Sequence, residues 1–291
     1  MNSFFDYIAN VLFDLNNRLN HGEKLCGCRS LQFNGGHLPD YNDPLVQDIY
    51  ILRYGLAYAY EYKQMYSRFF QENEVGKNLE VVSVGCGNMI DYWALRKEAP
   101  KNCKIVYHGV DTIEWNKRFY SFLGPTVDFN HQSISEYLAA RDKLTADVYV
   151  FPKSISEISD AELEKICNII RKKGIDKKEV YLLFAMRANE TSLKMDWQKT
   201  TRLYKVMCEV GMECSNELNI NGADSKVYEL DENFNSKLNS IVYKTLDNLP
   251  NMCKNYKNQE CTCNFCEENR NRPMLNNQYM RLQIFTFRKA A

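Results

Sequence analysis

The spacing of apolar residues along the chain changes between two periods, and each period predicts a kind of element. Near the N-terminus, Phe4, Ile8, Leu12 and Leu15 recur at intervals of three or four residues, which predicts an amphipathic helix within residues 1–20. Residues 79–84, "LEVVSV", are instead rich in β-branched side chains, as is typical of a strand. The same reasoning predicts further strands at residues 103–111, 125–134, 146–151, 179–186, 213–219 and 278–289.

Helical patterns fill the intervals between these strands. They lie at residues 88–99, 135–143, 159–173 and 196–212. The third has the clearest ends, because Ser159 and Glu162 have capping-box spacing and Gly174 follows the last turn. Strands that alternate with helices in this way predict right-handed crossovers and an α/β fold with a mostly parallel, seven-stranded sheet covered on both faces. We expect a helical extension over residues 1–74 and one sheet domain over residues 75–291.

A long aromatic helix is predicted before the first strand, from residue 44 to about residue 71. Asp43 has the position of an N-cap, and Pro44 that of the first helical residue. Tyrosines follow at steps of four and share one face: Tyr50, Tyr54, Tyr58, Tyr62 and Tyr66. This face either packs against a sheet or a second helix, or forms a stacking surface for a base or another aromatic substrate.

Charge and hydropathy exclude some classes of protein. The chain of 291 residues has 37 Lys and Arg residues and 37 Asp and Glu residues, so it has no global basic field for holding nucleic acid. No apolar run approaches the ~20 residues that cross a membrane, and the N-terminus lacks the basic region of a signal peptide. We expect a cytoplasmic protein without a membrane partner.

A glycine turn follows the first strand, in "VVSVGCGNMIDYW". The dinucleotide fingerprint G-x-G-x-x-G is incomplete, because Ile90 has the third position, and no Walker A ending is present. This stretch, together with "YHGVD" at the end of the second strand, resembles motifs I and II of the Rossmann-like, class I S-adenosylmethionine-dependent methyltransferases. The resemblance extends over roughly residues 79–220 and is mostly one of pattern.

The resemblance implies a cofactor site for S-adenosylmethionine. Gly85, Gly87 and Asn88 would line its methionine and ribose part, since glycine lets the backbone approach closely. Asp111 would accept hydrogen bonds from both ribose hydroxyls. The residues implied to contact adenine are Trp115, Gln132 and Ser133.

Two residues depart from the motif of this family. The family usually has an acid two residues before the first glycine, where this chain has Ser83, and a third glycine where this chain has Met89. The alternative is a Rossmann-like domain whose glycine turn holds no cofactor.

The loop after the fourth strand is where the resemblance implies the methyl acceptor. It reads "FPKSISEIS" and lacks the Asn/Asp-Pro-Pro motif of base-amino methyltransferases. Lys153 and Glu157 are candidate catalytic bases in this loop. The alternative for Glu157 is that it only shapes the start of the next helix.

Eleven cysteines are many for a protein in a reducing compartment, where disulfides are not expected. Five are isolated and are expected in the core: Cys86, Cys103, Cys167, Cys208 and Cys214.

Four others fall within 14 residues, in an insertion of about residues 245–275 before the last strand: Cys253, Cys261, Cys263 and Cys266. They predict a knuckle that holds zinc, or an iron–sulfur cluster with the same ligands; free thiols are the alternative. Cys26 and Cys28 would either add ligands or be independent.

These features together predict an S-adenosylmethionine-dependent methyltransferase. RNA is the favoured acceptor, with protein and small molecules as the alternatives, because residues 251–291 contain seven Lys and Arg residues against three Glu residues. A small basic excess also occurs on an ordinary solvated surface. The alternative is a non-catalytic scaffold of methyltransferase-like fold that binds RNA or a protein partner. Ser83 and Met89 favour that alternative.

Overall fold

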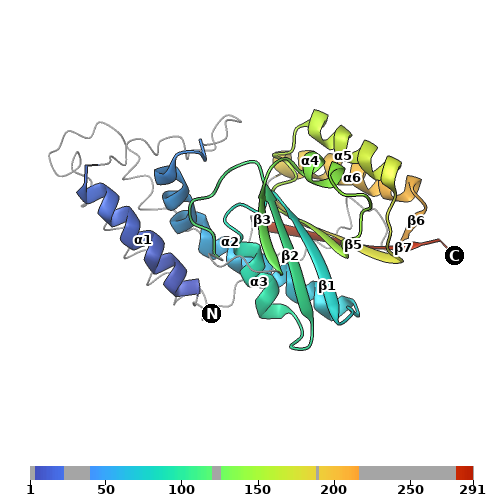
Figure 1. Ribbon diagram of the computed structural model, residues 1–291, viewed down its shortest axis with the longest axis horizontal. Coiled ribbons are helices and arrows are strands. Elements are labelled where there is room, and N and C mark those ends of the chain that lie inside the picture. Colours follow the sequence, from blue (N-terminus) through green and yellow to red (C-terminus); the bar gives the residue numbers. More distant parts are fainter. Residues whose placement is uncertain (1–3, 23–39, 120–125, 188–189, 216–279, 291) are drawn as a thin grey trace. The chain divides into compact units, whose positions relative to one another are not determined.

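The computed structural model describes residues 4–22, 40–119, 126–187, 190–215 and 280–290 (Figure 1). The chain divides into two compact units, which are described separately. The first contains the described residues of Met1–Ala59 and Glu114–Ser121, and the second contains those of Tyr60–Ile113, Phe122–Tyr228 and Asn277–Ala291. The predicted division at residue 74 stays a prediction. None of the described helices is long and apolar enough to span a membrane.

The first unit contains helix α1 (Phe4–Asn20) and the first part of α2 (Pro44–Glu72). The predicted amphipathic pattern of α1 is confirmed for Phe4, Ile8 and Leu15, which are buried, whereas Leu12 is half-buried. The start of α2 is also as predicted: the carboxylate of Asp43 accepts a hydrogen bond from the backbone N–H of Leu45 at 2.8 Å.

Two buried polar residues of α2 hold the segment of residues 114–119 within this unit. The side-chain amide of Gln47 donates to the carbonyl of Glu114 at 2.9 Å and accepts from the backbone N–H of Asn116 at 2.9 Å. Asp48 accepts from the Lys117 ammonium at 2.9 Å. Burial raises the pKa of Asp48, and Lys117 opposes that rise.

Three tyrosines of the predicted face of α2, Tyr50, Tyr54 and Tyr58, form ring contacts with one another. Within the first unit, Tyr50 lies 5.2 Å from Tyr54, and Tyr54 stacks on Tyr58 at 5.7 Å between ring centroids. Tyr50 also contacts Trp115 at 5.5 Å. These tyrosines therefore pack on one another, with Tyr50 also on Trp115, and their role in binding a ligand stays a prediction.

The second unit is built on a seven-stranded sheet of order β3-β2-β1-β4-β5-β7-β6. Its strands are β1 (Asn78–Val84), β2 (Lys104–Asp111), β3 (Val127–His131), β4 (Val148–Pro152), β5 (Glu179–Arg187), β6 (Met212–Cys214) and β7 (Met280–Lys289). Among them only β7 runs antiparallel to its neighbours, β5 and β6. The predicted mostly parallel α/β sheet is confirmed.

Helices lie on both faces of this sheet, as predicted. They are α3 (Ile90–Glu98), α4 (Ile134–Ala139), α5 (Asp160–Lys173), α6 (Glu190–Glu209) and residues 60–72 of α2. Figure 1 shows α4, α5 and α6 together on one face. Apolar side chains of these three helices pack there against Val82, Val84 and Phe151. On the other face, Phe69 of α2 contacts Tyr181 of β5 with 4.9 Å between ring centroids.

The predicted capping box at the start of α5 forms only in part. Ser159 accepts from the backbone N–H of Glu162, but the Glu162 carboxylate instead accepts from the backbone and hydroxyl of Ser135 in α4, at 2.9 and 3.0 Å. A complete capping box forms at α4, between Ser133 and Glu136. Contacts between helices thus replace one of the local bonds that the sequence predicts.

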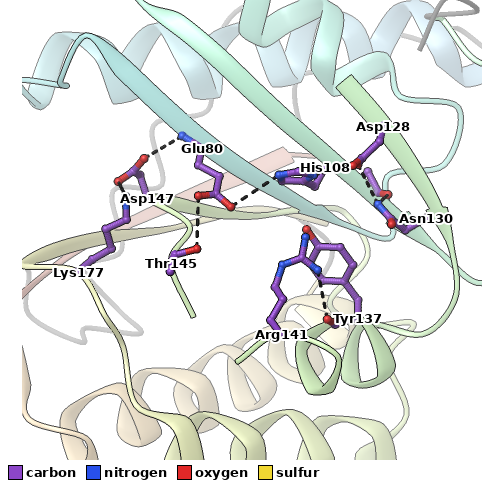
Figure 2. Close-up of polar contacts among 10 residues, drawn as sticks. Glu80, His108, Asp128, Asn130, Tyr137, Arg141, Thr145, Asp147 and Lys177 are labelled. Carbon is purple, nitrogen blue, oxygen red and sulfur yellow. Dashed lines mark hydrogen bonds and ion pairs between the residues drawn. The ribbon is translucent and has the colours of Figure 1, made fainter. Parts of the chain in front are cut away.

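Polar side chains occupy the face of the sheet near its β3 edge. Figure 2 shows Glu80, His108 and Asp128 on three neighbouring strands, above Tyr137 and Arg141. His108 Nδ1 lies 2.9 Å from both carboxylate oxygens of Asp128, and its Nε2 lies 3.6 Å from Glu80 Oε1. The Arg141 guanidinium stacks 3.5 Å from the centroid of the Tyr137 ring. Tyr137 also belongs to the apolar core of the sheet, so the polar cluster borders that core.

We predict that Lys173→Met destabilises the sheet unit by about 1–2 kcal/mol. The Lys173 ammonium donates to the carbonyls of Leu138 and Ala139 at 3.0 and 2.8 Å, and also to the carbonyl of Arg141, so it satisfies the C-terminal end of α4. Urea denaturation measures the change. Lys172→Met, at an exposed position of the same helix, is the control and should change the unfolding free energy by less than about 0.5 kcal/mol. Equal effects of the two substitutions would contradict the capping role.

Candidate functional site

The glycine loop between β1 and α3 has an alternating left-handed backbone. The φ angles of Gly85, Gly87 and Met89 are 64°, 53° and 63°. Glycine adopts this region without strain, whereas a residue with a Cβ atom does so at a cost of about 1–2 kcal/mol. Met89 is fully buried, and its N–H donates to the carbonyl of Cys86 at 2.9 Å, which helps to hold it in this conformation.

Gly85 lies where the end of β1 meets the loop after β4. A Cβ atom added at Gly85 would lie 2.5 Å from Cβ of Ser154, which is closer than two carbon atoms can approach. The Ser154 hydroxyl donates to the carbonyl of Val84, which fixes the two loops together. The chain order of the strands reverses between β1 and β4, and such a point is where open α/β sheets bind ligands.

Asp111, at the end of β2, joins the glycine loop to the loop that follows β2. Its Oδ2 accepts from the backbone N–H of Gly87 at 2.7 Å, and its Oδ1 accepts from that of Ile113 at 2.8 Å. Burial raises the pKa of Asp111, and these two hydrogen bonds oppose the rise. Asn88 is also buried, and its Nδ2 has no hydrogen-bond partner among the described residues. The structure thus brings Gly85, Gly87, Asn88 and Asp111 together.

The residues implied to contact adenine lie in different surroundings. Gln132 follows β3 next to Asp111, and its backbone N–H donates to the carbonyl of Asp111 at 3.0 Å. Ser133 is the N-cap of α4, where its hydroxyl accepts from the Glu136 N–H at 3.2 Å. Trp115 is buried in the first unit, where its ring also contacts Tyr41. Their contacts with adenine stay predictions.

Lys153 is buried at the end of β4 and has a left-handed backbone, with φ of 61°. Its ammonium forms an ion pair with the carboxylate of Glu61 in α2. Burial lowers the pKa of Lys153 and raises that of Glu61, while their mutual attraction opposes both shifts. This pairing fixes the loop after β4, so Lys153 has a structural role whether or not it is also a base.

Glu157 is placed at the same carboxyl edge of the sheet, with 34% of its side chain exposed. Its Oε1 accepts from the Arg187 guanidinium at 3.2 Å. Loss of hydration among the packed neighbours raises the pKa of Glu157 to about 7; Arg187 opposes the rise, and the nearby carboxylates of Asp111 and Asp196 add to it. A carboxyl group that is about half ionised near pH 7 is suited to accept a proton.

Three polar residues of this region were not singled out from the sequence: Glu61, Arg187 and Asp196. Asp196 of α6 is buried and accepts from the backbone N–H of Arg187 at 3.2 Å. Arg187 ends the fifth strand at the carboxyl edge, so its position next to the end of a predicted strand could have identified it as a candidate site residue. Glu61 and Asp196 lie within helical patterns, where nothing local distinguishes them.

The predicted metal ligands Cys253, Cys261, Cys263 and Cys266, like Cys26 and Cys28, lie outside the described residues. Within the described ranges, no group of three or more His, Cys, Asp or Glu side chains could hold a metal ion.

The isolated cysteines are partly as expected. Cys86, Cys103 and Cys167 are buried, but Cys208 is exposed and Cys214 is half-buried. The core prediction is therefore wrong for Cys208, which lies on the outer side of α6.

Comparison with known proteins gives no sequence relative. No protein-family model matches the chain, and no curated protein sequence matches it.

Several solved structures of methyltransferases share a weak likeness with the chain. A SAM-dependent methyltransferase from Archaeoglobus fulgidus is 14% identical over 78% of this chain and 92% of its own, with a TM-score of 0.38. The plantazolicin methyltransferase BpumL, in complex with a monoazolic desmethylPZN analog and SAH, is 11% identical over 97% and 99%, with a TM-score of 0.37. A putative methyltransferase of Haloferax volcanii, in complex with the Trm112 activator, is 13% identical over 69% and 89%, with a TM-score of 0.41. Such low scores add nothing to what the sheet order and the loop indicate.

We predict that Gly85→Ala disrupts the loop far more than a left-handed backbone alone explains. The control is Gly211→Ala, because Gly211 has φ of 83° but no atom within 4 Å of an added Cβ. Gly211→Ala should cost about 1–2 kcal/mol of unfolding free energy, and Gly85→Ala an additional ~1–3 kcal/mol from the clash. Denaturant titration measures both. Replacing Ser154 by Gly in the Gly85→Ala variant should recover part of the loss; equal costs for the two single variants would rule out the steric role.

Proposed function

We propose that this chain is an S-adenosylmethionine-dependent methyltransferase. The observation that carries the proposal is the hydrogen bond between the Gly87 N–H and the Asp111 carboxylate, which joins the left-handed glycine loop to the acid at the end of β2. Both lie at the carboxyl edge of the sheet, beside the point where the strand order reverses.

The residues at this edge fit a nucleoside ligand of this kind. Gly85 and Gly87 keep the loop free of side chains, so that a ligand can approach the backbone. Each carboxylate oxygen of Asp111 has a lone pair beyond the one used by the backbone, which leaves two acceptors for a pair of ribose hydroxyls. The buried Asn88 amide offers an additional donor. When bound, the cofactor supplies a methyl group that its sulfonium makes electrophilic.

The residues on the acceptor side of the site support methyl transfer to a nucleophile that loses a proton during the reaction. Glu157 is the candidate base, because its raised pKa lets it accept a proton near neutral pH. The main contribution of the site would be to orient the acceptor toward the methyl group. Lys153 serves more readily as a positioning residue, since its ammonium is engaged by Glu61. RNA remains the proposed acceptor, on the basic excess of residues 251–291.

The alternative is a non-catalytic scaffold, which Ser83 and Met89 favoured. One reason for the alternative is that Met89 has the place of the third glycine of the motif. The loop weakens this reason, because Met89 adopts the left-handed conformation that a glycine would have there. The remaining support for the alternative is the absence of an acid at the position of Ser83 itself. Isothermal titration calorimetry with S-adenosylmethionine and S-adenosylhomocysteine separates the two functions, since a scaffold without a cofactor site binds neither.

We predict that Asp111→Asn lowers cofactor affinity by about 10- to 100-fold, because an amide cannot replace a charged acceptor for two hydroxyls. Calorimetry with S-adenosylhomocysteine measures the loss, and circular dichroism checks the fold, since Asp111 also accepts from two backbone N–H groups. Asp128→Asn makes the same chemical change on the half-exposed edge strand and should leave affinity unchanged. Wild-type affinity in Asp111→Asn would exclude Asp111 from the cofactor site.

For the cysteine-rich insertion we predict one tightly held metal ion per chain, bound by Cys253, Cys261, Cys263 and Cys266 as thiolates. Elemental analysis of protein purified without chelator should find zinc or iron, and Cys263→Ser should lose it. The variant should become more sensitive to protease between about residues 245 and 275 and should bind the acceptor less well, with little change in cofactor affinity. Cys208→Ser, at an exposed cysteine outside the insertion, should keep the metal. Metal-free wild-type protein would refute the prediction.

A further inference from the structure

Asp91 is a buried carboxylate immediately behind the glycine loop. It is the second residue of α3, two positions after Met89, and only 1% of it is exposed. Its Oδ1 accepts from the hydroxyl of Tyr107 in β2 at 2.8 Å, and its Oδ2 accepts from the hydroxyl of Tyr66 in α2 at 3.4 Å. Both tyrosines are fully buried. This one side chain therefore connects the loop to β2 and to α2.

Within the described part of the chain, no cationic side chain balances Asp91. The groups that face it are the hydroxyls of Ser83 in β1, Tyr107 in β2 and Tyr66 in α2, and Cys86 of the loop lies next to Tyr107. Among the described residues, no lysine, arginine or histidine contacts the Asp91 carboxylate. The other buried acids of this edge are compensated differently: Glu61 has the Lys153 ammonium, and Asp111 has two backbone N–H groups.

The charge of Asp91 is therefore present at neutral pH but is not neutralised within the described protein. Burial raises the pKa of Asp91 from 3.8 to about 6, and the nearby hydroxyls of Ser83, Tyr107 and Tyr66 limit that rise. Because the pKa of Asp91 is higher in the folded state than the ordinary value of 3.8, the protein loses stability as the pH rises from about 4 to about 6, and the loss is complete above pH 6. A buried charge acts over a longer range than an exposed one, since little water screens it.

We propose that the Asp91 carboxylate is a counter-charge for a cationic ligand held at the glycine loop, and that it makes this loop prefer a sulfonium to the corresponding neutral thioether. This inference rests on the proposed function, in which S-adenosylmethionine is the methyl donor and S-adenosylhomocysteine the product. The two molecules differ by one methyl group and one positive charge. Asp91 thus acts as a specificity-determining residue that favours exchange of product for fresh donor.

A purely structural role of Asp91 predicts different effects of its substitution on the two ligand affinities and on stability. If Asp91 only held α3 against β2 and α2, its loss would weaken both ligands equally and would lower stability. If Asp91 supplies charge, Asp91→Asn weakens the sulfonium selectively. The same substitution should leave the protein no less stable at pH 8, because it removes a buried charge and its amide can still bond to the surrounding hydroxyls.

The experiment is a matrix of calorimetric titrations of the full chain with S-adenosylmethionine and with S-adenosylhomocysteine at pH 8. Asp91→Asn should lose about tenfold in affinity for S-adenosylmethionine and less than about twofold for S-adenosylhomocysteine, as expected for one lost charge interaction at short range. Tyr66→Phe keeps the charge and removes one hydrogen bond, so it should keep the wild-type ratio of the two affinities. Thermal unfolding of each variant at pH 8 reports on the fold.

A pH series on the wild type provides a test that does not depend on a folded variant. The ratio of the two affinities should fall as the pH decreases from 8 to 5.5, because Asp91 becomes neutral. Glu157 titrates nearby, and Glu157→Gln removes its contribution from the series. A ratio that stays constant in Glu157→Gln between pH 8 and 5.5, or an equal loss of both ligands in Asp91→Asn, overturns the role of Asp91 alone. A wild type that binds neither ligand overturns the proposed function as well.

Discussion

The backbone just after β1 leaves no space for a side chain at Gly85, and the arrangement of the carboxyl edge of the sheet depends on this close packing. At Gly85 an added Cβ atom would collide with Ser154, and at Gly109 of β2 it would lie 2.8 Å from Sγ of Cys86. The backbone of the glycine loop is therefore held between β2 on one side and the loop after β4 on the other. That position requires β1 to lie between β2 and β4, as it does in the observed strand order. The packing of the sheet, rather than the loop sequence alone, thus determines where a ligand can meet the backbone.

Buried acids surround this edge, and the way each one is compensated indicates its role. Burial raises the pKa of Glu61, Asp91, Asp111 and Asp196. Glu61 forms an ion pair with a lysine, Asp111 and Asp196 accept from backbone N–H groups, and Asp91 accepts from two tyrosine hydroxyls without a cation beside it among the described residues. An ion pair is internally neutral and fixes a loop, whereas a carboxylate that retains its charge contributes a negative potential to the edge. A concentration of such groups costs stability, which is typical of a functional site and unlike an ordinary core.

The sequence predicts the sheet well because each strand has its own local pattern, and most predicted strands agree with the observed ones within a few residues. The predictions fail where distant residues decide the structure. Glu162 leaves its local capping box to bind Ser135, and the predicted helix over residues 135–143 ends at Ala139, where Lys173 binds its last carbonyls. The candidate site shows the same division. Gly85, Gly87 and Asp111 follow from position along the chain, but Glu61 and Asp91 become recognisable only when folding brings α2 and β2 next to the loops.

The two departures from the methyltransferase motif have different physical consequences. At the third glycine position the backbone keeps the left-handed conformation, and burial of the Met89 side chain offsets part of the strain. At the acid position, Ser83 carries no charge, but its hydroxyl faces the carboxylate of Asp91 eight residues later. A negative charge is thus still present behind the loop, although it comes from the first turn of α3 instead of from β1. The electrostatic field at the loop depends on where a charge lies in space and not on its position in the motif. The presence of Ser83 instead of an acid therefore does not by itself argue against a cationic ligand there.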